Sequence, residues 1–349
     1  MTTTNKKILI VGPAWVGDMV MAQTLFKLIK QQNEQCVIDV LAPNWSRPLL
    51  QRMPEISNTI ALPIPHKKLH LLLRYRIGQR LRRRHYDQAI ILPNSLKSAF
   101  IPFIAKIPHR TGWLGEWRWL LLNDVRYLNK NKLPLMIERF MALALMKNME
   151  LPKELPRPSL KVTAANITKT LATLQLQTEK PILALCPGAE FGPAKRWPAT
   201  YFADVAREKL KAGWQVWLFG SAKDQIISQE IQQLTDNRCI DLAGKTSLAE
   251  AIDLLSLSQI VVSNDSGLMH IAAALNKPLV VLYGSSSPRF TPPLAEKVKI
   301  LNLDLACSPC FKRLCPLEHL KCLQDLLPHR VLDAIVELLP HQSTQTNIL

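Results

Sequence analysis

The sequence predicts an α/β protein of two domains, with the second domain a doubly wound parallel sheet. Short runs rich in Val, Ile and Leu alternate with helical segments, which is the order that builds parallel sheets. The segment Leu151–Pro158, LPKELPRP, has the proline content of a linker, and 349 residues suffice for two cores. We therefore expect domains at residues 1–158 and 159–349, with a C-terminal helix that could pack back on the first domain.

The first domain should begin with a buried strand at Lys7–Val11, since KILIV is apolar and rich in β-branched residues. The loop GPAWVGD and a helix over residues 19–31 follow. We expect further strands at 36–41 and 88–92, a basic helix between them, and a helix at 134–147. Asn94 and Lys97 occupy the junction after the last strand, where a ligand could be contacted.

The second domain should contain five strands and four further helices. The strands are expected at residues 182–186, 215–219, 239–242, 259–263 and 279–282, and the helices at 164–176, 199–211, 224–234 and 248–255. A fifth helix should run from the turn after the fourth strand to residue 275. Because parallel strands end at one edge of their sheet, the loops that follow them should converge there.

The loop NDSGLMH is the strongest candidate for a binding site. It places Asp265, Ser266 and Gly267 at a helix N-terminus, whose backbone N–H groups and dipole favour phosphate. His270 is four residues beyond Ser266 and so shares its helix face. A capped helix with one core histidine is the alternative that the residues leave open.

Two more loops should lie beside this one. The loop CPGAEFGPAKRWP, residues 186–198, carries Lys195, which could neutralise a diphosphate or simply face solvent. The loop FGSAKD carries Ser221 and Asp224, which could meet a ribose. In the first domain Asp18 begins a predicted helix, where it would serve either as a helix cap or as a base at the carboxyl end of the first strand.

The net charge of +17 is concentrated in the first domain, where residues 1–160 hold 25 Lys and Arg against 10 Asp and Glu. A polyanionic partner is expected: nucleic acid, anionic lipid headgroups or an acidic glycolipid. Nucleic acid ranks lower, because no RNA-binding aromatic signature or zinc finger occurs. No apolar run approaches the roughly 18 residues of a membrane span, and no secretory signal is evident, so a cytoplasmic protein is expected.

Lys67–Arg84 has no acidic residue and predicts an amphipathic helix. Such a helix can lie at a membrane surface or pack with a solvated basic face, and both remain open. Arg82, Arg83 and Arg84 are its densest charges. The segment Pro108–Trp119 mixes Arg110 and Arg118 with three tryptophans, which suits sugar stacking and anion pairing as well as a plain surface loop.

Four cysteines cluster near the C-terminus: Cys307, Cys310, Cys315 and Cys322. Their spacing allows a structural zinc or iron–sulfur site, and reduced thiols in a loop are the alternative. Disulfides are disfavoured in a reducing cytoplasm.

Taken as a set, several motifs resemble glycosyltransferase family nine, the heptosyltransferases. They are GPAWVGDMVMAQ, LPNSLKSAFIPF, IPHRTGW, CPGAEFGPAKRWP, LFGSAKD, LAGKTSL and NDSGLMHIAAALNKPLVVLYGSSSPRFTPPL, spread over about residues 6 to 295. The resemblance implies a GT-B arrangement, in which two Rossmann-like domains face each other across a cleft. The first would bind the acceptor and the second ADP-heptose. The implied acceptor is the first heptose on Kdo-lipid A, at the cytoplasmic face of the inner membrane.

The resemblance also implies residue roles. Asp18 resembles the general base, and Lys195, Ser266 and Gly267 resemble the groups that stabilise the departing diphosphate. Asp265 and His270 would contact the donor, Thr246 would lie near adenine, and Asp224 with Ser221 near ribose. Acceptor contacts would come from Asn94, Lys97, Arg110 and the arginines at 82–84. No Asp-x-Asp motif occurs, so neither a cofactor nor an obligate metal is expected.

Alternatives remain for the function. The enzyme that adds the first heptose, or another GT-B nucleotide-sugar enzyme, is one. A non-enzymatic basic protein that binds membrane or nucleic acid is another.

Overall fold

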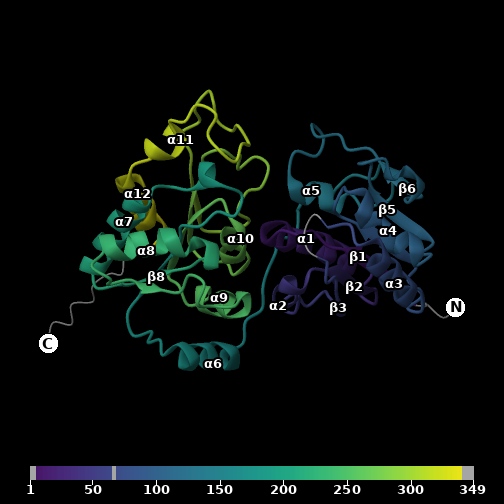
Figure 1. The fold of residues 1–349 in the computed structure, drawn as a ribbon, viewed down its shortest axis with the longest axis horizontal. Helices are drawn as coiled ribbons and strands as arrows, with labels where there is room; N and C mark the ends of the chain where they lie inside the picture. Colours follow the sequence, from purple (N-terminus) through teal and green to yellow (C-terminus); the bar gives the residue numbers. More distant parts are fainter. Residues whose placement is uncertain (1–4, 65–67, 340–349) are drawn as a thin grey trace. The chain divides into compact units, whose positions relative to one another are not determined.

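The computed structural model describes residues 5–64 and 68–339. The chain divides into two compact units (Figure 1). The first consists of Met1–Lys161 with Arg289–Thr291, and the second of Val162–Pro288 with Pro292–Leu349. The boundary between the two units, after Lys161, thus lies three residues beyond the end of the predicted linker. The last helix, α12 (Pro328–Leu338), belongs to the second unit and not to the first. The short segment Arg289–Thr291 is assigned to the first unit instead.

The first unit is built on a six-stranded parallel sheet with the order β3-β2-β1-β4-β5-β6. Its strands are β1 (Lys7–Val11), β2 (Val37–Ala42), β3 (Asn58–Ala61), β4 (Gln88–Ile91), β5 (His109–Trp113) and β6 (Asp124–Arg126). β1 lies at the centre, where Ile10 pairs with Val40 on one side and Ile90 on the other. The strand order reverses direction beside β1, which makes the sheet doubly wound.

Helices cover both faces of this sheet. They are α1 (Val16–Gln32), α2 (Arg47–Leu50), α3 (Leu71–Arg82), α4 (Leu96–Ile104) and α5 (Met136–Met141), with 3₁₀ turns η1 (Asn44–Ser46) and η2 (Arg118–Leu120). α1 packs against α5, and α3 packs against α4. Gly78 permits the second contact, because a Cβ there would lie 2.6 Å from the Ile104 side chain. Figure 1 shows α3 and α4 at the side of the unit away from α2.

The second unit repeats the plan with the order β12-β11-β10-β7-β8-β9. Its strands are β7 (Ile182–Cys186), β8 (Gln215–Leu218), β9 (Ile240–Asp241), β10 (Ile260–Asn264), β11 (Leu279–Leu282) and β12 (Val298–Leu301). Its helices are α6 (Ala164–Leu174), α7 (Ala199–Lys211), α8 (Gln225–Leu234), α9 (Leu248–Leu255), α10 (Gly267–Ala274), α11 (Lys321–Gln324) and α12, with 3₁₀ turns η3 (Pro193–Lys195) and η4 (Ala222–Asp224).

The burial of the central strands in the second unit explains why they could be predicted from the sequence. β7, β10 and β11 are buried at every position, as expected for parallel strands covered on both faces. Phe202 of α7 and Ile335 of α12 are fully buried in the cluster that these strands line. α12 therefore completes the core of the second unit.

Several elements differ from the sequence prediction. β3, β5, β6 and β12 were not predicted, and the helix expected at 134–147 is reduced to α5. The basic helix extends from Leu71 to Arg82; Lys67, the first residue of the predicted stretch, lies outside the described residues. Within residues 5–64 and 68–339, no helix combines the length and apolarity needed to cross a bilayer.

Candidate active site

The candidate donor site lies at the carboxyl edge of the second sheet. The loops after β7, β8, β9 and β10 carry, respectively, Lys195, Asp224, Thr246 and Asp265. Since all the strands are parallel, these loops share one edge, where α/β sheets bind ligands.

Lys195 and Asp265 form the centre of this edge. The Lys195 Nζ lies 2.5 Å from Asp265 Oδ2, and the Ser286 hydroxyl donates to the same oxygen at 2.5 Å. Asp265 is buried and Lys195 is 17% exposed, so the ion pair is largely shielded from water. The ammonium also lies 5.0 Å from the centre of the Phe191 ring, a cation–π contact. Lys195 is thus held in one place before any ligand arrives.

Asn264, the last residue of β10, fixes the loop that carries Lys195. Its side chain donates to the Pro187 carbonyl at 2.7 Å and accepts from the Trp197 backbone N–H at 3.1 Å. Trp197 is fully buried and its indole N–H donates to the Leu326 carbonyl at 2.7 Å. Because a buried polar side chain with hydrogen bonds on both its donor and its acceptor holds its partners in place, Asn264 fixes the position of the loop that carries Lys195.

The N-terminus of α10 lies beside the ion pair. The Ser266 side chain accepts from the Met269 N–H at 3.4 Å and so caps the helix, which confirms the predicted cap position. Gly267 is the first helical residue. The helix presents its positive end on the same loop that carries Asp265, so the edge offers both a dipole and a lysine to a phosphate.

His270 is buried one turn into α10. Its pKa is lowered to about 4, mainly by burial; the Asp265 charge opposes this shift and the Lys195 charge adds to it. The imidazole is therefore neutral at pH 7. It cannot add a positive charge for a phosphate, and a contact from His270 to a ligand would have to be a neutral hydrogen bond.

Asp224 is buried at the start of α8, and its carboxylate already accepts hydrogen bonds from within the protein. Its Oδ2 accepts from the Ser221 hydroxyl at 2.8 Å and from the Ser221 N–H at 2.9 Å. Gly188 passes so close that a Cβ there would lie 2.4 Å from the Asp224 carboxyl. Thr246 is half-buried and donates to the Leu242 carbonyl at 3.4 Å. Asp224, Ser221 and Gly188 therefore form one tight corner of the donor edge.

In the first unit, three predicted residues share the carboxyl edge of the sheet. Asp18 lies half-buried in the first turn of α1, whose N-cap position is Trp15. Asn94 and Lys97 lie where β4 passes into α4. Because β1 and β4 are adjacent parallel strands, the structure brings these three residues to the same edge.

Arg110 and the arginines at 82–84 lie at the other edge. Arg110 begins β5, and its guanidinium donates to the carbonyls of Leu121 at 2.8 Å and Ile107 at 2.6 Å. Arg82, Arg83 and Arg84 follow α3 at its C-terminal end, next to the start of β4. The structure therefore does not bring these four arginines together with Asp18.

Arg84 also has an internal partner. Its guanidinium lies 3.1 Å from Asp39 Oδ2, which accepts from the Tyr86 hydroxyl at 2.6 Å. Asp39 is buried in β2 and accepts from Asn58 as well, at 2.8 Å. One of the three arginines predicted to bind the acceptor thus neutralises a buried carboxylate of its own sheet.

Cys307, Cys310 and Cys315 lie in the irregular segment before α11, and Cys322 lies in α11 itself. Burial is the main cause that raises the Cys322 pKa, and the other three thiols add to it, so the four are near one another. Nevertheless, no three His, Cys, Asp or Glu side chains among the described residues are arranged to hold a metal ion. A structural metal site at these four cysteines stays a prediction.

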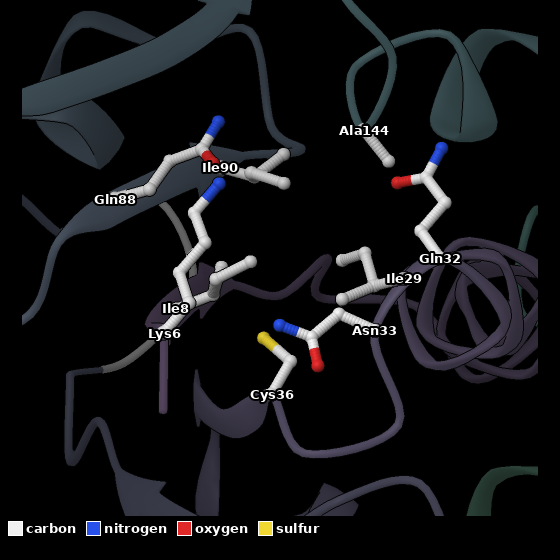
Figure 2. Close-up of a pocket in the computed structure, with 9 residues that line it drawn as sticks. All are labelled: Lys6, Ile8, Ile29, Gln32, Asn33, Cys36, Gln88, Ile90 and Ala144. Atoms are coloured by element: carbon white, nitrogen blue, oxygen red, sulfur yellow. The ribbon is translucent and has the colours of Figure 1, made fainter. Parts of the chain in front are cut away.

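A pocket of about 190 Å³ lies at the amino edge of the first sheet. Figure 2 shows Lys6 and Gln88 on one side of it and Gln32 and Asn33 on the other. These residues precede or begin β1, β4 and β2, so the pocket is at the opposite end of the strands from Asp18. It contains none of the predicted site residues.

Comparison with known proteins identifies the family. The model of glycosyltransferase family 9 (heptosyltransferase) matches residues 74–321. The chain belongs to glycosyltransferase family 9. It is 52% identical over 308 residues to lipooligosaccharide heptosyltransferase 2 of Haemophilus influenzae, covering 85% of this chain and 88% of that protein. It is 49% identical over 306 residues to lipopolysaccharide heptosyltransferase 2 of Escherichia coli, with the same coverage.

Solved structures of this glycosyltransferase family confirm the fold. The structure of E. coli ADP-heptose lps heptosyltransferase II has a TM-score of 0.85 at 45% identity, covering 95% of this chain and 98% of that one. E. coli heptosyltransferase WaaC with ADP has a TM-score of 0.69 at 18% identity, covering 95% and 100%. The two six-stranded parallel sheets are those of the GT-B fold, as predicted.

Two residues that hold loops of this chain in place, Ser286 and Arg118, could not be assigned that role from the sequence. Ser286, which donates to Asp265, lies in the loop GSSS after β11, where three serines in succession were the available signal. Arg118 was expected either to pair with an anion or to lie in a surface loop, yet it is fully buried and donates to the Trp113 carbonyl at 2.6 Å and to Ser98 Oγ at 3.1 Å. Nothing in its sequence neighbourhood, LGEWRWL, marks it as buried.

Proposed function

We propose that the protein is a lipopolysaccharide heptosyltransferase II. It transfers heptose from ADP-L-glycero-D-manno-heptose to the first heptose of the inner core on Kdo-lipid A. The names of relatives about 50% identical over 85% of the chain support this assignment. The lipid-linked acceptor implies a peripheral protein at the cytoplasmic face of the inner membrane.

The observation that carries the proposal is the ion pair of Lys195 and Asp265 beside the N-terminus of α10. The lysine and the helix dipole supply positive charge where a nucleotide diphosphate would develop negative charge as it leaves. Preorganised donors of this kind stabilise a transition state without reorganisation, and one such donor commonly contributes about 3 kcal/mol. Ser266 and Gly267 would bind the diphosphate together with Lys195, and Asp265 would hold Lys195 in place and contact the donor sugar.

The reaction we propose is a single displacement that inverts the anomeric centre. The acceptor hydroxyl attacks the anomeric carbon of the donor as its bond to the ADP oxygen breaks. Asp18 takes the hydroxyl proton, and ADP leaves with the bonding electrons. A carboxylate with an ordinary pKa of about 4 is a weak base for an alcohol, so proton transfer follows leaving-group departure.

The remaining contacts to the ADP-heptose donor would come from the corner formed by Asp224, Ser221 and Gly188, together with Thr246 and His270. Asp224, held by Ser221, would accept from a ribose hydroxyl through the oxygen that Ser221 does not use. Thr246 would lie near adenine. His270, being neutral, would donate or accept a hydrogen bond without adding charge.

Acceptor binding is best assigned to Asn94 and Lys97. Both lie at the edge that carries Asp18, whereas Arg110 and Arg82 to Arg84 lie at the other edge. Any role for those four arginines would be contact with more distant anions of a large acceptor.

The deciding experiment is transfer from ADP-heptose to Kdo-lipid A that carries either no heptose or one. We expect product only with the monoheptosylated acceptor. Product with the heptose-free acceptor alone would identify the enzyme that adds the first heptose, and no ADP-heptose turnover with either would refute a transferase function. Specific ADP binding, measured by calorimetry, separates both enzyme functions from a non-catalytic basic protein.

A further inference from the structure

Exposed apolar side chains gather at one place on the first unit, around the N-terminus of α4. Leu72 and Tyr75 of α3 are 77% and 47% exposed, and Leu96 of α4 is 44% exposed. Trp117 and Leu120, in the loop after β5, are 85% and 68% exposed. We call these residues, with Trp119, the aromatic patch. Soluble proteins rarely leave such large apolar side chains clustered in water without a partner for them.

Hydrogen bonds join the three segments of the aromatic patch. Arg74 of α3 donates to the Lys97 carbonyl at 3.1 Å, which ties the start of α3 to the start of α4. The Leu96 N–H donates to Glu116 Oε2 at 2.8 Å, which ties the loop after β5 to the same turn. The three segments that carry the patch therefore lie close together at this edge of the sheet.

The loop that carries the tryptophans is held rigidly. Arg118 is fully buried beneath it and donates to the carbonyls of Trp113 and Pro93 and to Ser98 Oγ. Glu116 and Trp117 both adopt left-handed backbone angles, φ +42° and +55°, which are costly for residues other than glycine. The chain thus maintains an unfavourable backbone conformation, braced by a buried arginine, in the turn that exposes Trp117.

The surroundings of the aromatic patch are basic. Lys68 precedes α3, Arg76 lies exposed in its first half, and Lys97 lies beside Leu96. The Glu116 carboxylate within the patch accepts a hydrogen bond from the N-terminus of α4. Tryptophan, tyrosine and leucine side chains rimmed by cations are suited to the interface of an anionic bilayer, where rings lie at headgroup depth and Lys and Arg pair with lipid phosphate.

We propose that the aromatic patch docks this protein on an anionic lipid bilayer by inserting Trp117, Trp119 and Leu120 at headgroup depth. The N-terminal turns of α3 contribute Leu72 and Tyr75, and the surrounding Lys and Arg supply attraction to the lipid charge. The patch lies at the edge of the sheet that also carries Asp18, Asn94 and Lys97, so docking presents that edge to the membrane. The proposal concerns the lipid surface alone and does not depend on which sugar is transferred.

The test is sedimentation of the full chain with vesicles of phosphatidylcholine containing one-quarter phosphatidylglycerol, without acceptor. The variant carries Trp117→Ser and Leu120→Ser. Its control is Ile226→Ser, which removes an equally exposed side chain (80%) from α8 in the second unit. We expect the double variant to lose about ten-fold or more in vesicle affinity, and the control and the single variant Trp117→Phe to bind close to wild type.

Two further measurements make the result decisive. Thermal unfolding and ADP affinity of the double variant should match wild type, because the changed side chains are exposed. Lipids brominated near the headgroup should quench wild-type tryptophan fluorescence more than that of Trp117→Phe. Equal vesicle affinity of wild type and double variant would overturn the proposal, as would binding to duplex RNA in preference to vesicles.

Discussion

The Lys195 ammonium and the Ser286 hydroxyl meet at a single oxygen of Asp265, each 2.5 Å away. Asp265 therefore holds the lysine in position, and the lysine in turn screens the carboxylate from an incoming diphosphate. The two side chains act as a unit, so their substitutions should not have independent effects.

Lys195→Met should lower kcat/KM for ADP-heptose by about 10- to 100-fold, the value of one charge-assisted contact of 1.5–3 kcal/mol. It also leaves Asp265 unpaired and repulsive to the diphosphate. The double variant Lys195→Met, Asp265→Asn should therefore recover part of the lost ADP affinity, as calorimetry would show. Lys211→Met, at an exposed pair on α7, is the control and should be unaffected. Strictly additive losses would contradict the coupling.

Asp18→Asn should reduce kcat by about 10² to 10⁴, the usual contribution of a general base, because the amide cannot accept the acceptor proton. ADP affinity should stay within about two-fold of wild type, since Asp18 and the donor edge belong to different units. Initial rates and calorimetry provide both values, and Glu154→Gln in the linker is the control. A kcat within ten-fold of wild type would leave Asp18 a structural residue of the α1 first turn.

Excess chelator should leave the rate unchanged. In the proposed mechanism the positive charge for the leaving diphosphate comes from Lys195 and the α10 N-terminus, and no divalent ion is required for it. Initial rates with and without EDTA, after dialysis against chelator, give the answer. A complete loss that Mg²⁺ restores would refute this assignment of charge.

His270 should make stability fall in mildly acidic solution. Its pKa is about 4 in the folded protein and about 6.5 unfolded, so the unfolded chain binds more protons between these values. Stability contributed by neutral His270 is therefore fully present above pH 6.5 and is lost as the pH falls toward 4. Between pH 7 and pH 5 the loss is about 2 kcal/mol. His270→Gln should show a correspondingly smaller decrease in unfolding free energy in denaturant titrations, and an identical decrease would contradict the shift.

The sequence predicted the central strands well and the outer ones poorly. β7, β10 and β11 are buried on both faces, so composition alone marks them. β5 reads HRTGW, with only one large apolar residue, and is a strand because Thr111 and Gly112 pair with β4 and β6. Such pairing is a tertiary property that no local pattern encodes.

The candidate site likewise contains residues whose position the sequence predicts and residues whose position it does not. Residues at strand ends and helix starts, such as Asp18 and Ser266, could be placed from the alternation of elements. Arg110 and Arg84 could not, because their direction depends on which carbonyls and carboxylates the folded sheet brings near them. The Ser286 contact joins residues 21 positions apart across two loops, and its recognition required the folded structure.

In the proposed donor site the Lys195 ammonium already pairs with Asp265, so a small anion would have to compete with that carboxylate for the lysine. Inorganic phosphate, which has no further contacts to add, would gain little there. A nucleotide sugar overcomes that competition by adding contacts along its whole length. In the proposed mechanism, the aspartate that holds the lysine in position would also select against ligands that offer only a phosphate.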